Sequence, residues 1–152
     1  MRKVLAAAAV IVLSSTVALA AGMPVIDAVK SGNVEAVRTL LQKRVDVNLA
    51  ESDGMTALHW AARNNDLASA RLLLRAGANT KATTRYGVTP LALAAQNGSS
   101  QMLDLLLKGG ADANAALPEG ETALMTAART GSAASIKAVS YTHLTLPTTE
   151  RV

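Results

Sequence analysis

The apolar residues of this chain recur in short clusters with helical spacing. Leu58, Ala61 and Ala62 stand at positions i, i+3 and i+4, which places them on one face of a short helix. After a polar turn, a second apolar set with the same kind of spacing occupies residues 67–74, and Gly77 follows it. The pattern therefore predicts an all-α fold built from pairs of short helices, each with one face available for packing.

This two-helix unit repeats along the chain with a period of 33 residues. Three series carry the period most clearly: Gly54, Gly87 and Gly120; Thr56, Thr89 and Thr122; Leu58, Leu91 and Leu124. One step backwards from Ala61 finds Ala28, so the period extends into the N-terminal part of the chain. A single unit of this size cannot bury its apolar faces, and we expect neighbouring units to stack and bury them together.

Two short motifs within the unit resemble the ankyrin repeat. Gly-x-Thr-x-Leu openings begin the stretches 54–62 and 87–95, and Leu-Leu-Leu-x-x-Gly-Ala segments occupy 72–79 and 105–112. The resemblance covers about residues 24–139. It implies an ankyrin-repeat solenoid of stacked antiparallel helix pairs, with β-turn fingers projecting from one edge. We expect a repeat domain over 23–139 with about four repeats, the last one incomplete, at approximately 23–50, 51–83, 84–116 and 117–139.

Residue types at the predicted helix ends agree with this architecture. Thr56 can cap the first helix of its repeat, and Gly54 permits the tight turn before it. The turn between the two helices contains Asn65 or Gly98, where we expect a positive φ. Arg44 replaces the glycine that ends the second helix elsewhere, so this helix should bear a conformational cost or end differently. The first repeat also lacks the Gly-x-Thr-x-Leu opening, as an N-terminal capping repeat would.

The N-terminus has the layout of a secretory signal. Two basic residues follow Met1, an apolar run occupies residues 4–21, and Ala18-Leu19-Ala20 supplies a small-x-small cleavage site. We expect residues 1–20 to be a cleaved signal peptide and the mature chain to be periplasmic or secreted, in a bacterial type of cell. An uncleaved anchor is the alternative, because the run is near the shortest length that spans a bilayer.

The repeat pattern fails near the C-terminus. Ser140 stands where earlier repeats have leucine, His143 takes the slot of the cap glycine, and a threonine-rich stretch follows. Residues 140–152 resemble translated adapter sequence rather than a capping repeat, so we expect a non-native tail that is disordered or loosely attached. We also expect the natural protein to continue with further repeats. A genuine but unusual C-terminus is the alternative.

Composition and charge exclude several classes of function. Hydrophobic residues make up 50% of the chain, yet it contains no Phe, one Trp and two Tyr, so its core must consist largely of closely packed Ala and Leu. The formal charge of +4 becomes +2 on signal cleavage, because Lys+Arg falls from 15 to 13 against 11 acids. So small a charge, scattered along the chain, does not indicate nucleic-acid binding.

The reactive side chains exclude the common catalytic and metal sites. The chain has no cysteine and two histidines, His59 and His143, which rules out a His/Cys metal cluster and leaves no credible catalytic triad. His59 occupies the usual histidine position of the ankyrin repeat, which implies a structural role. Trp60 is expected to pack between helices. We therefore expect a protein that is not an enzyme and has no cofactor and no metal.

The resemblance implies a protein-interaction module that meets its partner on the concave face. We expect a protein partner, no nucleic acid, no stable membrane insertion after signal cleavage, and a monomer. The alternative is the targeting arm of a longer protein whose effector or enzymatic domain lies elsewhere. Candidate partner-binding residues lie at the finger tips and at the ends of the first helices: Ser52, Asp53, Met55, Arg63, Asn64, Arg85, Tyr86, Val88, Gln96, Asn97, Glu119, Glu121, Arg129 and Thr130.

Overall fold

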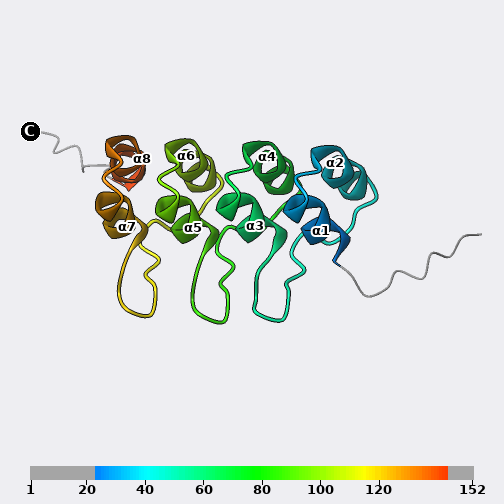
Figure 1. Cartoon of the computed structure of the whole chain (residues 1–152), viewed down its shortest axis with the longest axis horizontal. Coiled ribbons are helices and arrows are strands. Elements are labelled where there is room, and N and C mark those ends of the chain that lie inside the picture. The colour runs from blue at the N-terminus through cyan, green and yellow to red at the C-terminus, as the bar shows by residue number, and fades with distance from the viewer. Residues whose placement is uncertain (1–22, 144–152) are drawn as a thin grey trace, which may run out of the picture.

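The structure, a computed structural model, describes residues 23–143, with side chains up to residue 140. The described chain forms four antiparallel helix pairs stacked side by side along one axis (Figure 1). The inner row of helices is α1, α3, α5 and α7, and the outer row is α2, α4, α6 and α8. Their bounds are Pro24–Lys30, Val34–Gln42, Ala57–Arg63, Leu67–Arg75, Pro90–Gln96, Ser100–Lys108, Ala123–Arg129 and Ala133–His143 for α1 to α8 in order. The predicted all-α ankyrin-type solenoid is confirmed.

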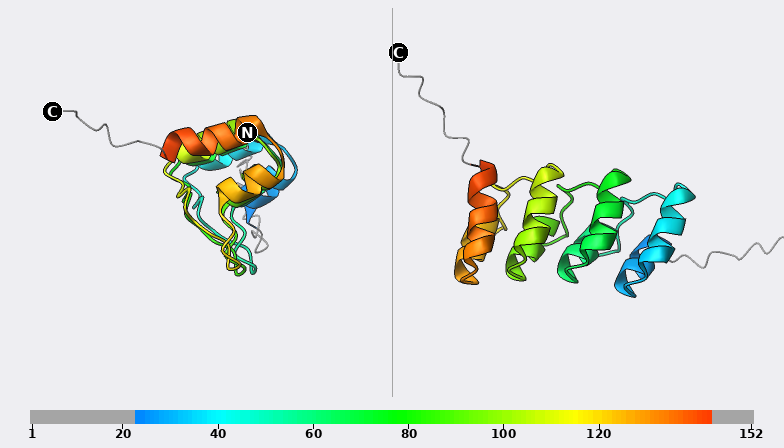
Figure 2. Two further views of the ribbon diagram at one scale, coloured as in Figure 1. Left: turned by 90° about the vertical axis from the view of Figure 1, so that its left-hand side faces the viewer. Right: turned by 90° about the horizontal axis from the view of Figure 1, so that it is seen from above.

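Three loops project from the solenoid as fingers, over residues 50–56, 83–89 and 116–122, and all leave the helices in the same direction (Figure 2). Each finger is closed by backbone hydrogen bonds between its arms, such as Thr84 N–H to Val88 O at 3.0 Å. Gly54 has φ +89°, and a Cβ there would lie 2.8 Å from the Cα of Thr84 in the next finger. Only glycine therefore allows neighbouring fingers to pack this closely.

The predicted helix caps are present. Thr56 is the N-cap of α3, and its hydroxyl accepts a hydrogen bond from the His59 N–H. Thr89 and Thr122 cap α5 and α7 in the same way. Because these residues recur every 33 positions, α3, α5 and α7 each begin at the same point of their repeat, which keeps these helices in register along the stack.

The turns adopt the left-handed backbone that the sequence predicts. Asn65 has φ +54° at the turn where Gly98 has φ +64°. Arg44 has φ +55° at the position that corresponds to Gly77, where φ is +88°. The first repeat therefore keeps the common helix end instead of changing it. Arg44 bears the conformational cost, which is about 1–2 kcal/mol for a residue with a Cβ.

The core runs the length of the solenoid between the stacked pairs. Leu58, Leu73, Leu91 and Leu106 are fully buried, as predicted. Small residues fill the spaces where helix backbones approach most closely, and these are also fully buried: Ala61, Ala62, Ala94 and Ala95. Aliphatic and small side chains thus replace the large aromatic residues that the chain lacks.

The final helix extends beyond the predicted end of the repeat domain. We placed that end at residue 139, but α8 continues to His143. Val139 is fully buried, and α8 packs against both α6 and α7. This anchoring supports one further helical turn despite the unfavourable residue types. The predicted signal peptide and the rest of the C-terminal tail lie outside the described residues.

Candidate functional site

The fingers and the exposed sides of the inner helices meet at an angle, which is clear when the solenoid is viewed along its axis (Figure 2). We call this surface the inner face. One row of exposed side chains runs along it in the last turns of the inner helices, separated by one repeat each: Lys30, Arg63, Gln96 and Arg129. We call these residues the polar row. Three of its four members are cations.

A compact cluster surrounds Trp60 at the N-terminal end of the inner face. The Trp60 ring is half-buried and contacts two cations, with Lys30 Nζ 4.4 Å and Arg63 Cζ 5.3 Å from its centroid. Glu51, on the first finger, accepts a hydrogen bond from the indole N–H at 2.7 Å and forms an ion pair with Lys30. The expectation that Trp60 packs between helices is therefore wrong in part, since one side of the ring belongs to the inner face.

A related arrangement exists on α7. Glu121, at the end of the third finger, pairs with Arg129 at 2.9 Å and accepts a hydrogen bond from the Thr126 hydroxyl at 3.0 Å. Thr126 stands two repeats after Trp60, and Arg129 stands two repeats after Arg63. In both places a finger carboxylate fixes a cation of the polar row. The fingers and helices of the inner face are therefore joined by charged contacts.

His59 has the structural role that the repeat position implies. Its Nδ1 accepts the Thr56 N–H at 3.2 Å, so Nε2 carries the proton and donates to the Val88 carbonyl at 3.0 Å. Burial lowers the pKa of His59 below its ordinary value, and the hydrogen bond to Val88 opposes this shift in part. The neutral, fully buried ring links one repeat to the finger of the next and is closed to any substrate.

Most predicted partner-binding residues are on the surface. Those that are exposed are Ser52, Arg63, Asn64, Arg85, Tyr86, Gln96, Asn97, Glu119, Arg129 and Thr130. Asp53, Val88 and Glu121 are half-buried. The prediction is wrong for Met55, which is buried. Its N–H and carbonyl are held by Asp53 and Glu51 at the base of the finger, and this turns its side chain inward.

Two of the exposed candidates also connect neighbouring repeats. The Asn97 side-chain amide donates to the carbonyls of Ala62 and Arg63, at 3.0 and 2.7 Å, and so satisfies the C-terminal end of α3. The Arg85 guanidinium donates to the Ser52 carbonyl at 2.8 Å, between fingers. Asn97 and Arg85 are therefore structural contacts between repeats as well as surface residues.

The sequence itself matches known families over most of the described region. The family model "Ankyrin repeats (many copies)" matches residues 25–74, and "Ankyrin repeats (3 copies)" matches residues 76–143. The chain belongs to the ankyrin repeat family. No match was found among curated proteins. Ankyrin repeats generally mediate protein–protein interaction, and this agrees with an exposed inner face of varied side chains.

Sequence reasoning missed two residues of this ankyrin surface, Lys30 and Glu51. Lys30 stands one repeat before Arg63, so the period contained a signal for it. Glu51 gave no such signal, because its partners lie 9 and 21 residues away on two different helices. The exposure of two apolar residues of α7, Leu124 and Met125, was also not predicted.

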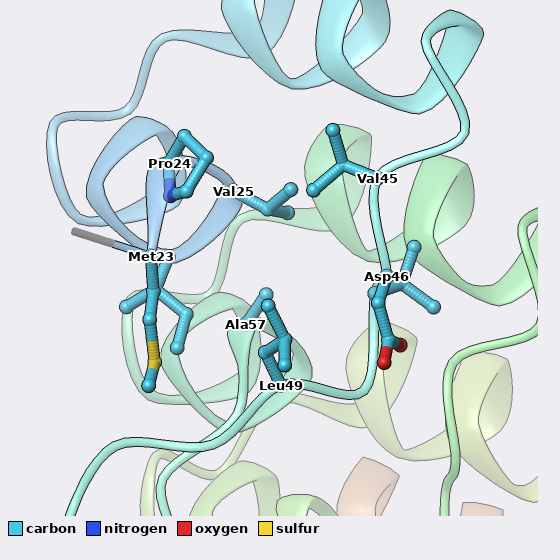
Figure 3. Close-up of a pocket in the computed structure, with 9 residues that line it drawn as sticks. Met23, Pro24, Val25, Val45, Asp46, Leu49 and Ala57 are labelled. Carbon is cyan, nitrogen blue, oxygen red and sulfur yellow. The ribbon is translucent and has the colours of Figure 1, made fainter. Parts of the chain in front are cut away.

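One pocket lies at the N-terminal end of the ankyrin domain. The pocket in Figure 3 lies beneath the first repeat, is too narrow to admit a water molecule, and is lined mainly by apolar side chains such as Met23, Val25 and Leu49, with Asp46 as its one ionisable residue. Among residues 23–143, no three His, Cys, Asp or Glu residues are grouped to hold a metal ion. Within the same range, no helix has the length and apolar character needed to span a bilayer.

Proposed function

We propose that this ankyrin chain is a non-catalytic module that binds a protein partner along its inner face, outside the cytoplasm. The observation that carries the proposal is the inner face itself. Its exposed side chains recur once per repeat, and its Trp60 cluster presents an aromatic ring together with arginine. Trp, Tyr and Arg are the residue types most enriched among energetically dominant interface residues.

The non-catalytic part of the proposal rests on the residue inventory. The sequence contains no cysteine, and His59, one of its two histidines, is neutral, buried and committed to two backbone partners. Two carboxylates of the inner face are likewise paired with cations: Glu51 with Lys30, and Glu121 with Arg129. This arrangement suits recognition better than proton transfer.

The binding surface can be tested by site-specific photocrosslinking. A benzophenone amino acid replaces Gln96 on the inner face, and in a second variant it replaces Arg71, which is exposed on α4 of the outer row. We expect periplasmic extract to yield discrete protein adducts with the Gln96 probe and none with the Arg71 probe. Equal adduct patterns from both probes would contradict binding along the inner face.

Export is supported by the N-terminal sequence alone, with its basic start, apolar run and Ala18-Leu19-Ala20. Expression in a bacterial host, followed by fractionation and N-terminal sequencing of the exported protein, tests it. We expect a mature N-terminus at Ala21. Recovery of a full-length chain in the membrane fraction would instead identify an anchor.

A further inference from the structure

We infer that the partner segment bound by the inner face is acidic and aliphatic, with a carboxylate on Arg63 and aliphatic side chains on Trp60 and Leu93. This inference rests on the proposed function and specifies the chemistry of the partner. It is carried by the unused donors of Arg63, which lies over the Trp60 ring, and by the spacing of the two rows of side chains on the inner face.

The acids that contact the polar row are already occupied. Glu51 accepts from Lys30 with one carboxylate oxygen and from Trp60 with the other. Glu121 accepts from both Arg129 and Thr126 with the same oxygen. Both carboxylates are recessed, with 29% of each side chain exposed. Both oxygens of Glu51 are therefore engaged, and Glu121 is already paired with a cation through one oxygen.

The cations of the polar row have donors left. An arginine side chain has five N–H donors, and Arg129 uses one of them on Glu121 while its side chain stays 67% exposed. Arg63 is exposed, and among the described residues no carboxylate or carbonyl accepts from its guanidinium. Arg63 thus keeps charged donors that no group of the described chain satisfies, and the ligand group that complements them is a carboxylate.

Arg63 is also held in place before a ligand arrives. Its guanidinium lies over the Trp60 ring, and the ring is fixed by the hydrogen bond from its indole N–H to Glu51. Cation–π contact orients the guanidinium without using its N–H donors. A carboxylate can then bind Arg63 at a lower entropic cost than it would meet at a freely rotating surface arginine.

A second row of side chains on the inner face is apolar, and it favours aliphatic side chains in the ligand. Leu93 stands one repeat after Trp60 and is also half-buried, so the two form an apolar row beside the polar row. The corresponding residue on α1 is Asp27, so the apolar row begins at Trp60. An extended segment running along both rows would present alternate side chains to each, because successive residues of a strand point in opposite directions.

The length of such a segment follows from general geometry. Packed helices lie about 8–10 Å apart, and an extended chain rises about 3.3 Å per residue. About three residues therefore span one repeat, and about six span the two repeats from α3 to α7, so an octapeptide covers this distance with about one residue to spare at each end. The matching probe is an acetylated and amidated octapeptide in which glutamate alternates with leucine.

The experiment measures binding of this fluorescein-labelled octapeptide by anisotropy, using the chain as expressed. Two control peptides carry lysine or glutamine in place of glutamate. Trp60 is the one tryptophan in the sequence, so its emission reports whether an unlabelled peptide occupies the inner face. We expect the glutamate peptide to bind, to change the Trp60 emission, and to weaken with added salt, and we expect the lysine peptide not to bind.

Two matched variants test the residue assignment. Arg63→Gln removes the proposed carboxylate ligand, whereas Arg75→Gln removes the same charge from exposed α4 in the outer row. We expect Arg63→Gln to weaken binding of the glutamate peptide about tenfold or more, and Arg75→Gln to leave it unchanged. Equal effects of the two variants, preference for the lysine peptide, or no binding would overturn the inference.

The two experiments distinguish a failure of this inference from a failure of the proposed protein-binding function. If a crosslinked protein partner binds Arg63→Gln as tightly as the original chain, the binding function stands and the inference of an acidic segment is wrong. If the glutamate peptide binds through Arg63 but the Gln96 probe captures no protein, the chemistry of the inner face stands and the proposed cellular function fails.

Discussion

The interior repeats and the last repeat of the described solenoid use the same positions in different ways. Leu58 and Leu91, in the second and third repeats, are each 1% exposed, whereas the corresponding Leu124 of the fourth repeat is 39% exposed. His59 is fully buried, but Met125, two repeats later, is 58% exposed. The residue type alone does not decide burial at these positions. Burial depends on whether a following repeat covers the helix.

This difference shows where stability resides in the solenoid. The caps and turns of the second, third and fourth repeats are nearly the same, so the local structure differs little between these units. The contacts with the next repeat differ most. Stability in such a molecule is approximately a sum of repeat and interface terms. Substitutions at equivalent positions should therefore separate the interface contribution from that of the repeat.

The largest effect is expected from truncating the two equivalent leucines. Leu91→Ala should lower the free energy of unfolding by about 2–5 kcal/mol, because it leaves a cavity between repeats. Leu124→Ala should lower it by about 1 kcal/mol or less, since that side chain is partly exposed. Urea titration followed by circular dichroism measures both. Equal losses would show that burial by the next repeat does not determine stability here.

A second pair compares His59 with Met125. His59→Ala removes the ring that caps α3 and binds the Val88 carbonyl, and two such hydrogen bonds contribute about 2 kcal/mol together. Met125→Ala should change the free energy of unfolding by about 0.5 kcal/mol at most. The same urea titrations apply. A loss at Met125 that matches the loss at His59 would contradict the proposed difference between the two repeats.

His59 should also make stability depend on pH. Because its pKa is lowered in the folded chain, the unfolded chain binds a proton first as the pH falls below the ordinary value of 6.5. Its contribution is therefore constant above that pH and is lost progressively below it, down to the folded pKa. Urea midpoints from pH 8 to 5 should fall more for the original chain than for His59→Gln, and parallel curves would contradict this.

Backbone conformation distinguishes the first repeat from the second. Arg44→Gly should raise the free energy of unfolding by about 1 kcal/mol, because it removes a Cβ from a left-handed position. Gly77→Ala, at the equivalent position, should lower it by about 1 kcal/mol. A Cβ at Gly77 would meet no atom within 4 Å, so backbone strain alone is measured. Changes of the same sign in both variants would refute this explanation.

The smallest effect is expected at two buried serines. Ser69 and Ser135 stand two repeats apart, are fully buried, and have hydroxyl oxygens without a hydrogen-bond partner in the described structure. Ser69→Ala should therefore stabilise the chain by about 0.5 kcal/mol, and Ser135→Ala should do the same. Thermal unfolding of both variants tests this. Destabilisation by either would show that its hydroxyl has a role in packing or bonding.

Most of the fold could be predicted from the sequence because the 33-residue repeat marks where each helix begins and ends. Thr56, Asn65 and Gly98 each take their conformation from a local requirement, so residue type was sufficient. The end of α8 was missed because packing of Val139 outweighs the poor local pattern. Local chemistry could not indicate that Met55 turns inward.

Much of the candidate site could be listed from the sequence, but its organisation could not. Arg63 and Gln96 follow from their place at the ends of the first helices. The contacts of Glu51 depend on how the finger folds back onto two helices. The 33-residue repeat pattern does not indicate which residues these contacts join. The polar row was therefore recognised only in part.

The links between repeats have a mechanical consequence. The backbone bond from Arg85 N–H to Asp53 O, the Asn97 contacts with α3, and the His59 contact with Val88 all connect consecutive repeats. Tension applied to the two ends of the solenoid loads such interfaces in series, so the weakest one yields first. Extension should then proceed in steps, and each repeat released adds roughly 110 Å of extended chain. The domain would act as a spring that lengthens one repeat at a time.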